Sequence, residues 1–561
     1  MGRDRIAIII ILAVGLLIRF IGLGQLPPSL NWDEVSHGYN AYSILRTGKD
    51  EWGEFLPLTN FRAYGDYPLP VNLYLTIPSI ALFGLNEFGI RFPHAILGTA
   101  IILSTYFLVY GLKFGKTVAL LAALFVAIDP WMFFPSRAVF QSNVASFFLI
   151  TGVALFLYRK KHFLFLPTSA ISVGLSLYSY HNTRIFVPLL LLVVGIVWFK
   201  EFKASIFKQN KVFISSLLIL IAFLVPLYFV FTSQEGRARS KWVFLLDEGS
   251  IARIIEMREK SNLPEPIDRL LYNRYSFFIS EFGKNFIGYF SPRFLFTSGG
   301  SNYQFSVPDK GILYPINAPF FYVGLTLVAL AVFKKKRSEK TFLFFWLILG
   351  LIPASITQGE FHVIRATTIV PLPQIFVALG LATFWAWFKQ QNLKLLFSII
   401  YVVLLLYFME NYAREYVGPY RTNYSWSWQY GYKEAVQFIK GHYNGYNQII
   451  MTKKYGEPHE FLLFYWPWDP EKYRQDPNLI RFAQSNWYWV DRFDKFYFVN
   501  DWEIPRDGSA SWRMESGGIV PLSGKTLLIT SPGNYPSGWR LLQTINFLDN
   551  KPAFDILEKT I

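Results

Sequence analysis

The stretch IAIIIILAVGLLIRFIGLG, residues 6–24, is followed closely by the acidic run Trp32-Asp33-Glu34. An apolar run of about 20 residues is long enough, as a helix, to cross the hydrocarbon core of a bilayer. Comparable runs recur through the first three quarters of the chain, so we predict a polytopic α-helical membrane protein with about 11 transmembrane helices. The predicted spans are residues 6–24, 94–112, 117–134, 139–158, 163–180, 184–199, 212–232, 316–333, 341–357, 366–388 and 394–409.

The composition fits this class of protein. Of the 561 residues, 52% are hydrophobic and 16% are charged, whereas an average soluble protein carries roughly a quarter charged residues. A single soluble enzyme is therefore excluded. The chain contains no cysteine, which also excludes a disulfide framework and a thiol nucleophile.

The net charge of +16 lies almost wholly in alternate gaps between the predicted spans. Because Lys and Arg collect on the cytoplasmic side, we predict a multi-pass protein of the cell (plasma) membrane with a cytoplasmic amino terminus. Residues 25–93, 233–315 and 411–561 then lie in extracytoplasmic space. Residues 69–83 are apolar but short and contain two prolines, so we expect surface or re-entrant helices there. Because the positive charge lies in the gaps between predicted spans, we do not expect nucleic acid as a partner.

We expect two main parts, a transmembrane catalytic domain over residues 1–410 and a small extracytoplasmic α/β domain over 411–561. The elements expected in the second part are strands at Ile449–Thr452, Phe496–Val499 and Thr526–Thr530 and a helix at Lys433–Lys440. This part is rich in Trp and Tyr, whose faces suit sugar rings, so we interpret it as shaping the choice of acceptor. The alternative is that these aromatics form the core of this part and its contact with the membrane surface.

Chemistry is expected first in the loop 25–93. Asp33 and Glu34 follow the first span closely, so both carboxylates should lie near the outer membrane surface, where a lipid-linked substrate presents its head group. The alternative is a solvated acidic pair. Trp32 favours the functional interpretation because interfacial aromatics hold a loop at headgroup level.

Cations at the outer ends of spans form a second group. Arg19 lies within the first predicted span, and Arg91, Arg137, Arg184 and Arg365 fall at outward-facing span ends. Such arginines either snorkel to the headgroups or bind an anionic headgroup through paired hydrogen bonds. The histidines lack metal-binding spacing, but a divalent metal held by Asp33 or Glu34 and one histidine stays open as an alternative.

Short motifs occur in a fixed order along the chain. They are Trp32-Asp33-Glu34, Gly65-Asp66-Tyr67-Pro68, FGLNEFGIRFP at 83–93, Asp129-Pro130-Trp131, SRAVFQSN at 136–143, YSYHNTR at 178–184, and HVIRA at 362–366 with Pro371. Together they resemble the dolichyl-phosphate-mannose protein mannosyltransferase-like enzymes of glycosyltransferase family 39, in a bacterial type. Members of this family have the C-type (GT-C) membrane fold. The resemblance covers roughly residues 1–410 and the C-terminal domain only loosely.

The resemblance implies a polyprenyl-phosphate-linked sugar as donor and an acidic residue of the first outer loop, here Asp33, as catalytic, with Glu34 in support. Two departures are visible. Gln141 stands where related sequences often carry an acid, and Asp66-Tyr67-Pro68 lacks the lysine that precedes the paired prolines. We therefore assign the donor phosphate to arginines, namely Arg19, Arg137 and Arg365. The residues expected to line the substrate cavity are Asp66, Tyr67, Arg91, Gln141, Asn143, His181, Arg184 and His362.

This chemistry needs only one carboxylate. A phosphate leaving group is already a weak base, so no general acid is required, and Asp33 takes the proton of the attacking hydroxyl while cations hold the phosphate. Direct displacement predicts inversion at the anomeric carbon of a sugar passed to a protein, lipid or glycan acceptor. The alternatives are an oligosaccharide polymerase or en-bloc glycan transferase, an inactive glycan-binding relative, and a lipid-linked sugar flippase or transporter with its site near the membrane midplane.

Overall fold

The structure is a computed structural model that describes residues 2–65, 67–207, 210–232, 243–333, 339–484, 487–507 and 511–560. The candidate residue Asp66 thus lies outside the described residues. The chain forms two compact units. The first consists of Met1–Ile21, His94–Ser136 and Phe140–Ala413, and the second of Gly22–Pro93, Arg137–Val139 and Arg414–Ile561. The predicted division near residue 410 is different, because the loop before residue 94 clusters with the C-terminal part.

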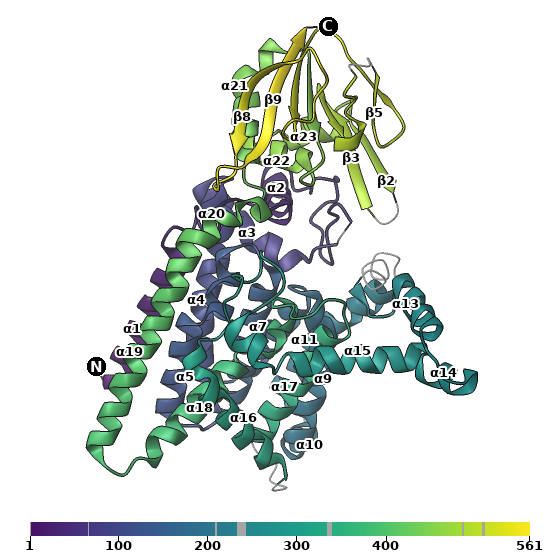
Figure 1. The fold of residues 1–561 in the computed structure, drawn as a ribbon. Coiled ribbons are helices and arrows are strands. Elements are labelled where there is room, and N and C mark those ends of the chain that lie inside the picture. Colours follow the sequence, from purple (N-terminus) through teal and green to yellow (C-terminus); the bar gives the residue numbers. More distant parts are fainter. Residues whose placement is uncertain are drawn as a thin grey trace. The chain divides into compact units, whose positions relative to one another are not determined.

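The first unit is helical, and every predicted span coincides with a helix (Figure 1). These helices are α1 (Arg3–Phe20), α4 (Glu87–Gly111, which begins in the second unit), α5 (Lys116–Ile128), α7 (Gln141–Leu157), α8 (Phe165–Leu177), α9 (His181–Val197), α11 (Lys211–Thr232), α16 (Ala318–Phe333), α17 (Glu339–Ser355), α18 (Leu372–Trp387) and α19 (Gln391–Glu415). The remaining helices of this unit are α6 (Pro130–Phe133), α10 (Phe199–Phe207), α13 (Glu248–Glu259), α14 (Glu265–Leu271) and α15 (Arg274–Gly288).

The lengths of these helices bear on how many cross the membrane. In the part of the chain that the structure describes, four helices are long and apolar enough to span a bilayer, or up to six if each of two bent pairs is one span. Helices α7, α8 and α18 have 17, 13 and 16 residues. At about 1.5 Å per residue they fall short of the ~30 Å hydrocarbon core. The predicted helices are confirmed, whereas the count of about 11 crossings stays a prediction.

The first part of the second unit contains two helices, α2 (Trp32–Thr47) and α3 (Pro70–Phe83). The acidic pair opens α2 because Asn31 caps this helix. The Asn31 side chain accepts a hydrogen bond from the Glu34 N–H at 2.9 Å, and the Glu34 carboxylate accepts one from the Asn31 N–H at 3.3 Å. This reciprocal capping box fixes where the helix starts. Helix α3 has 14 residues, about 21 Å of helix, and the expectation that residues 69–83 do not cross stays a prediction.

The C-terminal part of the second unit folds around a seven-stranded sheet of order β2-β3-β4-β1-β7-β9-β8, in which β4, β1 and β7 are parallel (Figure 1). The strands are β1 (Gln448–Thr452), β2 (Ile480–Gln484), β3 (Trp487–Phe493), β4 (Phe496–Val499), β7 (Lys525–Thr530), β8 (Arg540–Asn546) and β9 (Pro552–Thr560), with the separate pair β5 (Ser511–Arg513) and β6 (Ile519–Pro521). The helices are α20 (Arg421–Asn423), α21 (Tyr432–His442), α22 (Pro458–Tyr465) and α23 (Pro470–Arg474). The three predicted strands and the predicted helix are confirmed.

Alternate residues of the strands face two separate apolar clusters, as the period of a pleated strand requires. On β1, Ile449 and Met451 join the cluster that also holds Phe461 of α22 and Val35 of α2, whereas Ile450 joins the cluster on the opposite face. The larger cluster therefore contains residues of the first outer loop as well as of the C-terminal part. Its buried aromatics include Tyr39, Phe61, Tyr432, Phe461, Phe464, Phe493, Phe496 and Phe554. Much of the aromatic content thus forms the core, in line with the alternative given above.

Burial of His37 makes the stability of this unit depend on pH. Its Nε2 atom lies 3.3 Å from the Thr76 hydroxyl and its ring packs on Phe61. Burial lowers the pKa of His37 from 6.5 to about 4. Between these values the unfolded chain binds a proton that the folded chain does not, so the free energy of unfolding rises with pH and levels off above about 6.5.

We therefore expect the apparent free energy of unfolding to fall by about 3 kcal/mol more in the wild type than in His37→Gln when the pH is lowered from 7 to 4. Tryptophan fluorescence of the purified protein during unfolding measures this difference. His442→Gln, at an exposed position, is the matched control and should follow the wild type. Equal pH dependence in His37→Gln and wild type would show that the buried ring does not resist protonation.

Candidate active site

Asp33 presents an exposed carboxylate in the first turn of α2. The hydroxyl of Tyr64 donates a hydrogen bond to Asp33 Oδ1. A carboxylate at this position also interacts favourably with the positive end of the helix dipole. The arrangement holds the carboxylate in a defined orientation while leaving it exposed.

Aromatic rings surround Asp33. The ring of Tyr64 lies 6.1 Å from that of Trp32 and 5.4 Å from that of Trp487, measured between centroids. Two glycines with positive φ allow this packing. A Cβ on Gly65 would lie 2.3 Å from Trp487, and one on Gly456 would lie 2.1 Å from Trp32. Any larger residue at either position would displace a ring that orients the Asp33–Tyr64 pair.

Glu34, the neighbour of Asp33, is fully buried and pairs with Arg91. Arg91 Nε lies 2.9 Å from Glu34 Oε1, and Arg91 Nη2 lies 3.0 Å from Oε2. The remaining Arg91 donors reach the backbone carbonyls of Leu23, Pro27 and Ser29 at 3.3, 3.0 and 2.5 Å. Every donor group of this guanidinium thus has a protein acceptor, so Arg91 has none left for a ligand.

The Glu34 carboxylate also accepts hydrogen bonds from backbone N–H groups. Besides Arg91 and the Asn31 N–H, it accepts a hydrogen bond from the Val139 N–H at 3.1 Å. The Glu34–Arg91 pair therefore joins the chain entering α2, the start of α4 and the segment Arg137–Val139. These contacts indicate a positioning role for Glu34 and Arg91, whereas the sequence suggested contact with substrate.

Arg137 belongs to the same unit as Asp33 and is 2% exposed. Its Nε donates to the Tyr416 hydroxyl at 3.3 Å and its Nη2 to the Leu26 carbonyl at 3.2 Å, with the guanidinium over the Tyr416 ring. Tyr67, another candidate, has its hydroxyl 3.2 Å from that of Tyr488 in β3. The structure thus places Asp33, Tyr67 and Arg137 in one unit.

Other candidates lie in the helical unit. The guanidinium of Arg19 is fully buried and donates to the carbonyls of Gly15, Val126 and Ala127 at 2.9–3.0 Å, which ties α1 to α5. Asn143 of α7 donates to the His94 carbonyl at 3.0 Å. Arg19 therefore serves helix packing, because burying a guanidinium requires that its donors be satisfied. Gln141, the first residue of α7, is half-buried.

Two motifs that are distant in sequence meet in this unit. Asn182 of the 178–184 motif donates to the Arg365 carbonyl of the 362–366 motif at 2.8 Å. Arg365 donates to the Gln358 carbonyl at 2.6 Å, and His362 packs against Phe305 at 5.2 Å between ring centroids. The remaining pair, His181 and Arg184, starts α9, with Arg184 Nε donating to the Leu177 carbonyl at 3.2 Å. His362, Arg365 and the start of α9 are thus close together.

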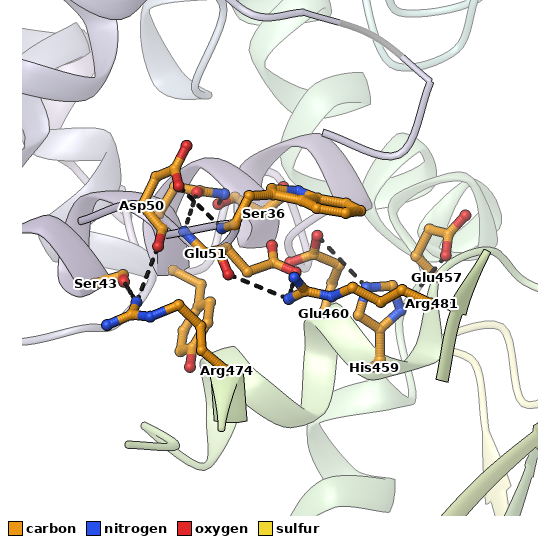
Figure 2. A network of polar contacts seen from close by, with 12 residues as sticks. Ser36, Ser43, Asp50, Glu51, Glu457, His459, Glu460, Arg474 and Arg481 are labelled. Atoms are coloured by element: carbon orange, nitrogen blue, oxygen red, sulfur yellow. Dashed lines mark hydrogen bonds and ion pairs between the residues drawn. The ribbon is translucent and has the colours of Figure 1, made fainter. Parts of the chain in front are cut away.

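A further group of titratable residues was missed by the sequence analysis. Glu51, which follows α2, lies against His459 and Glu460 of α22, and Arg481 of β2 contacts Glu51 (Figure 2). The one sequence signal was the run Glu457-Pro458-His459-Glu460, but nothing in the sequence connects it to Glu51. Among the described residues, Glu51, His459 and Glu460 are the acids and histidine whose ligand atoms lie close enough together to hold a metal ion. This group includes neither Asp33 nor Glu34.

The motifs resemble those of a family of membrane glycosyltransferases, and a family model supports this resemblance. Residues 9–235 match the family model described as dolichyl-phosphate-mannose-protein mannosyltransferase. This confirms the resemblance carried by the motifs, over less than half of the chain. An uncharacterised protein of Aquifex aeolicus (strain VF5) is 29% identical over 165 residues, which are 28% of this chain and 31% of that relative. The chain thus spans about a third of the length of this relative.

Several solved structures are similar to the chain. The chain is similar to ArnT from Cupriavidus metallidurans in its apo state, with TM-score 0.51, 11% identity, and coverage of 98% of this chain and 97% of that chain. The same ArnT bound to undecaprenyl phosphate matches with TM-score 0.51 and 10% identity over the same shares. An Archaeoglobus fulgidus oligosaccharyltransferase matches with TM-score 0.48 and 14% identity over 82% of this chain and 64% of that chain. The likeness to ArnT shows the helical, membrane-type GT-C fold.

Breaking the Glu34–Arg91 pair should destabilise the second unit. Glu34→Gln leaves the Arg91 charge buried without its counter-ion, so we expect the free energy of unfolding to fall by about 3 kcal/mol or more. Glu54→Gln removes an exposed acid from the same loop and should change it by less than about 0.5 kcal/mol.

Thermal unfolding of the purified variants measures both effects. Adding Arg91→Met to Glu34→Gln should recover part of the loss, because the unpaired charge is then gone. A Glu34→Gln protein as stable as Glu54→Gln would contradict the positioning role.

Proposed function

We propose that this protein is a membrane glycosyltransferase that transfers a sugar from a polyprenyl-phosphate-linked donor to an extracytoplasmic protein, lipid or glycan acceptor, with inversion. The family match over residues 9–235 and the likeness to ArnT, which has been solved with undecaprenyl phosphate, support a lipid-linked donor. The multi-pass helical unit supports a location in the cell membrane.

The observation that carries the proposal is the exposed Asp33 carboxylate fixed by the Tyr64 hydroxyl. A general base must be ionised, accessible and oriented toward the hydroxyl whose proton it takes. As the acceptor oxygen attacks C1 of the sugar, Asp33 receives its proton and the C1–O bond to phosphate breaks. The phosphate leaves with that electron pair and needs no proton at neutral pH. In this proposal Glu34 is a positioning residue, because its contacts hold the start of α2 in place.

We propose fewer cations for the site of the departing phosphate than the sequence suggested. Arg19 donates to three backbone carbonyls, so we remove it from the phosphate site and keep Arg137 and Arg365. Each has a planar guanidinium whose paired donors match two phosphate oxygens. His181, Arg184 and His362, near Arg365, are proposed to complete the donor side.

For the acceptor side we propose the C-terminal part. The carboxyl ends of the parallel strands β1, β4 and β7 open on a cavity of about 1140 Å³, the place where open α/β sheets commonly bind ligands. Its lining includes Lys453, Trp489, Asp501, Trp502 and Asn534. A Trp ring beside charged and amide groups suits a polar acceptor that carries sugar rings.

Asp33→Asn keeps the shape of the site and removes the base, so we expect kcat for transfer to fall by at least ~100-fold. The assay supplies a synthetic polyprenyl-phosphate sugar and measures sugar on the acceptor, with thermal unfolding to show that the variant folds. Near-normal turnover in Asp33→Asn would refute the assignment. Transfer of preassembled oligosaccharides alone, or transport of the donor without transfer, would support an en-bloc transferase or a flippase instead.

Arg137→Lys and Arg365→Lys test the phosphate site. Each conserves the charge but loses the paired hydrogen bonds, so we expect KM for the donor to rise about tenfold with KM for the acceptor unchanged. Arg253→Lys, at an exposed position in α13, is the control and should match the wild type. Unchanged donor kinetics in both test variants would remove these arginines from the site.

A further inference from the structure

A second candidate site lies within the second unit, apart from Asp33. Glu51, His459 and Glu460 are 2%, 3% and 2% exposed, and each offers a ligand atom within 4.8 Å of those of the other two (Figure 2). Glu51 comes from the turn after α2, whereas His459 and Glu460 come from the first turn of α22. Two carboxylates and an imidazole are thus held together inside the protein, away from water.

Several polar atoms of this cluster lack hydrogen-bond partners among the described residues. They are Oε2 of Glu51, Oε2 of Glu460 and Nδ1 of His459. The nearest acids to the ring are Glu457 Oε2 at 3.5 Å from Nδ1 and Glu460 Oε1 at 3.8 Å from Nε2, in ion-pair range but without hydrogen-bond geometry. Leaving such atoms unsatisfied in a buried site costs about 1–3 kcal/mol each. A ligand that accepts electron pairs from all three would remove that cost.

The charges around the cluster point to a cation. Glu51, Glu457 and Glu460 are buried acids, and Arg481 is the basic group beside them, with Nη2 3.2 Å from Glu51 Oε1. Lys453 is engaged elsewhere by Asp491 and Glu515, at 2.5 and 3.0 Å. If the three acids are ionised, a single divalent cation balances them together with Arg481. Without one, a proton shared by Glu51 and Glu460 is the alternative.

We propose that Glu51, His459 and Glu460 bind one divalent metal ion of the zinc type. Zn²⁺ commonly takes His nitrogen together with Asp or Glu oxygen, whereas Mg²⁺ and Ca²⁺ prefer oxygen alone. The neutral imidazole is the form that ligates a metal. Glu457 and water are the candidates for a further ligand.

Such an ion would fasten the first outer loop to the C-terminal part within this unit. From the cluster, contacts lead toward Asp33. Glu457 accepts a hydrogen bond from Trp487 Nε1 at 2.8 Å, Trp487 packs on Tyr64, and the Tyr64 hydroxyl donates to Asp33. Through these contacts the metal would act as a positioning element for Asp33. Its presence does not depend on the proposed glycosyltransferase function.

The test is the metal content and ligand set of the full-length protein, purified without a polyhistidine tag or chelator. We expect about one equivalent of zinc-type metal per chain by mass spectrometry, and X-ray absorption with one nitrogen and several oxygen neighbours. Removing the metal with a chelator should lower the apparent Tm by at least ~5 °C, and adding Zn²⁺ should restore it. These readouts require no enzymatic activity, so they are separable from failure of the proposed function.

Variants identify the ligands. Glu51→Gln, Glu460→Gln and His459→Gln should each reduce bound metal to less than about a tenth of the wild-type content, whereas Glu54→Gln, in the same loop, should retain it. If a ligand variant does not fold, the X-ray absorption spectrum of the wild type still shows which types of ligand atom surround the metal. A wild type without metal that gains no stability from added Zn²⁺ or Mn²⁺ would overturn the proposal in favour of a protonated Glu51–Glu460 pair. Metal retained in all three variants would also overturn it, by placing the ion elsewhere.

Discussion

The buried ion pair between Glu34 and Arg91 is the constraint on which the candidate active site depends. A carboxylate and a guanidinium removed from water are stable only when every lone pair and every N–H group has a partner. Here the partners are the carbonyls of Leu23, Pro27 and Ser29 and the N–H groups of Asn31 and Val139. Satisfying them fixes the path of the chain before α2 and the point at which the helix begins.

Glu34 is buried, whereas its neighbour Asp33 is exposed. Residues 34–41 of α2 are buried, and Asp33, which precedes them in the first turn, is held by the Tyr64 hydroxyl. The two members of one acidic dipeptide thus lie in opposite environments, Glu34 as a buried counter-ion and Asp33 as an exposed carboxylate, the proposed base. The Trp32, Tyr64 and Trp487 rings then limit how Asp33 moves.

The sequence was informative where the signal is local. Apolar runs such as 212–232 became helices, and Ile449–Thr452 became part of β1, because hydrophobic periodicity follows directly from the burial of one face. It could not separate the tasks of Asp33 and Glu34, since that depends on the caps and on Arg91. Nor could it find the Glu51–His459–Glu460 cluster, because contacts between distant segments leave no local pattern. The length of α7 and α18 likewise depends on kinks and caps that hydropathy does not register.

The second unit is built from both ends of the sequence, and this has a consequence for function. Val35 and Tyr39 of α2 share one apolar cluster with Phe461 and Phe464 of α22. The helix that carries Asp33 therefore packs directly on the fold whose parallel strands open on the large cavity. A change in the C-terminal part that loosens this core would also move Asp33. If that cavity receives the acceptor, the acceptor-binding surface and the proton-accepting group belong to one folded body, so selection of the acceptor and its deprotonation are set by the same packing.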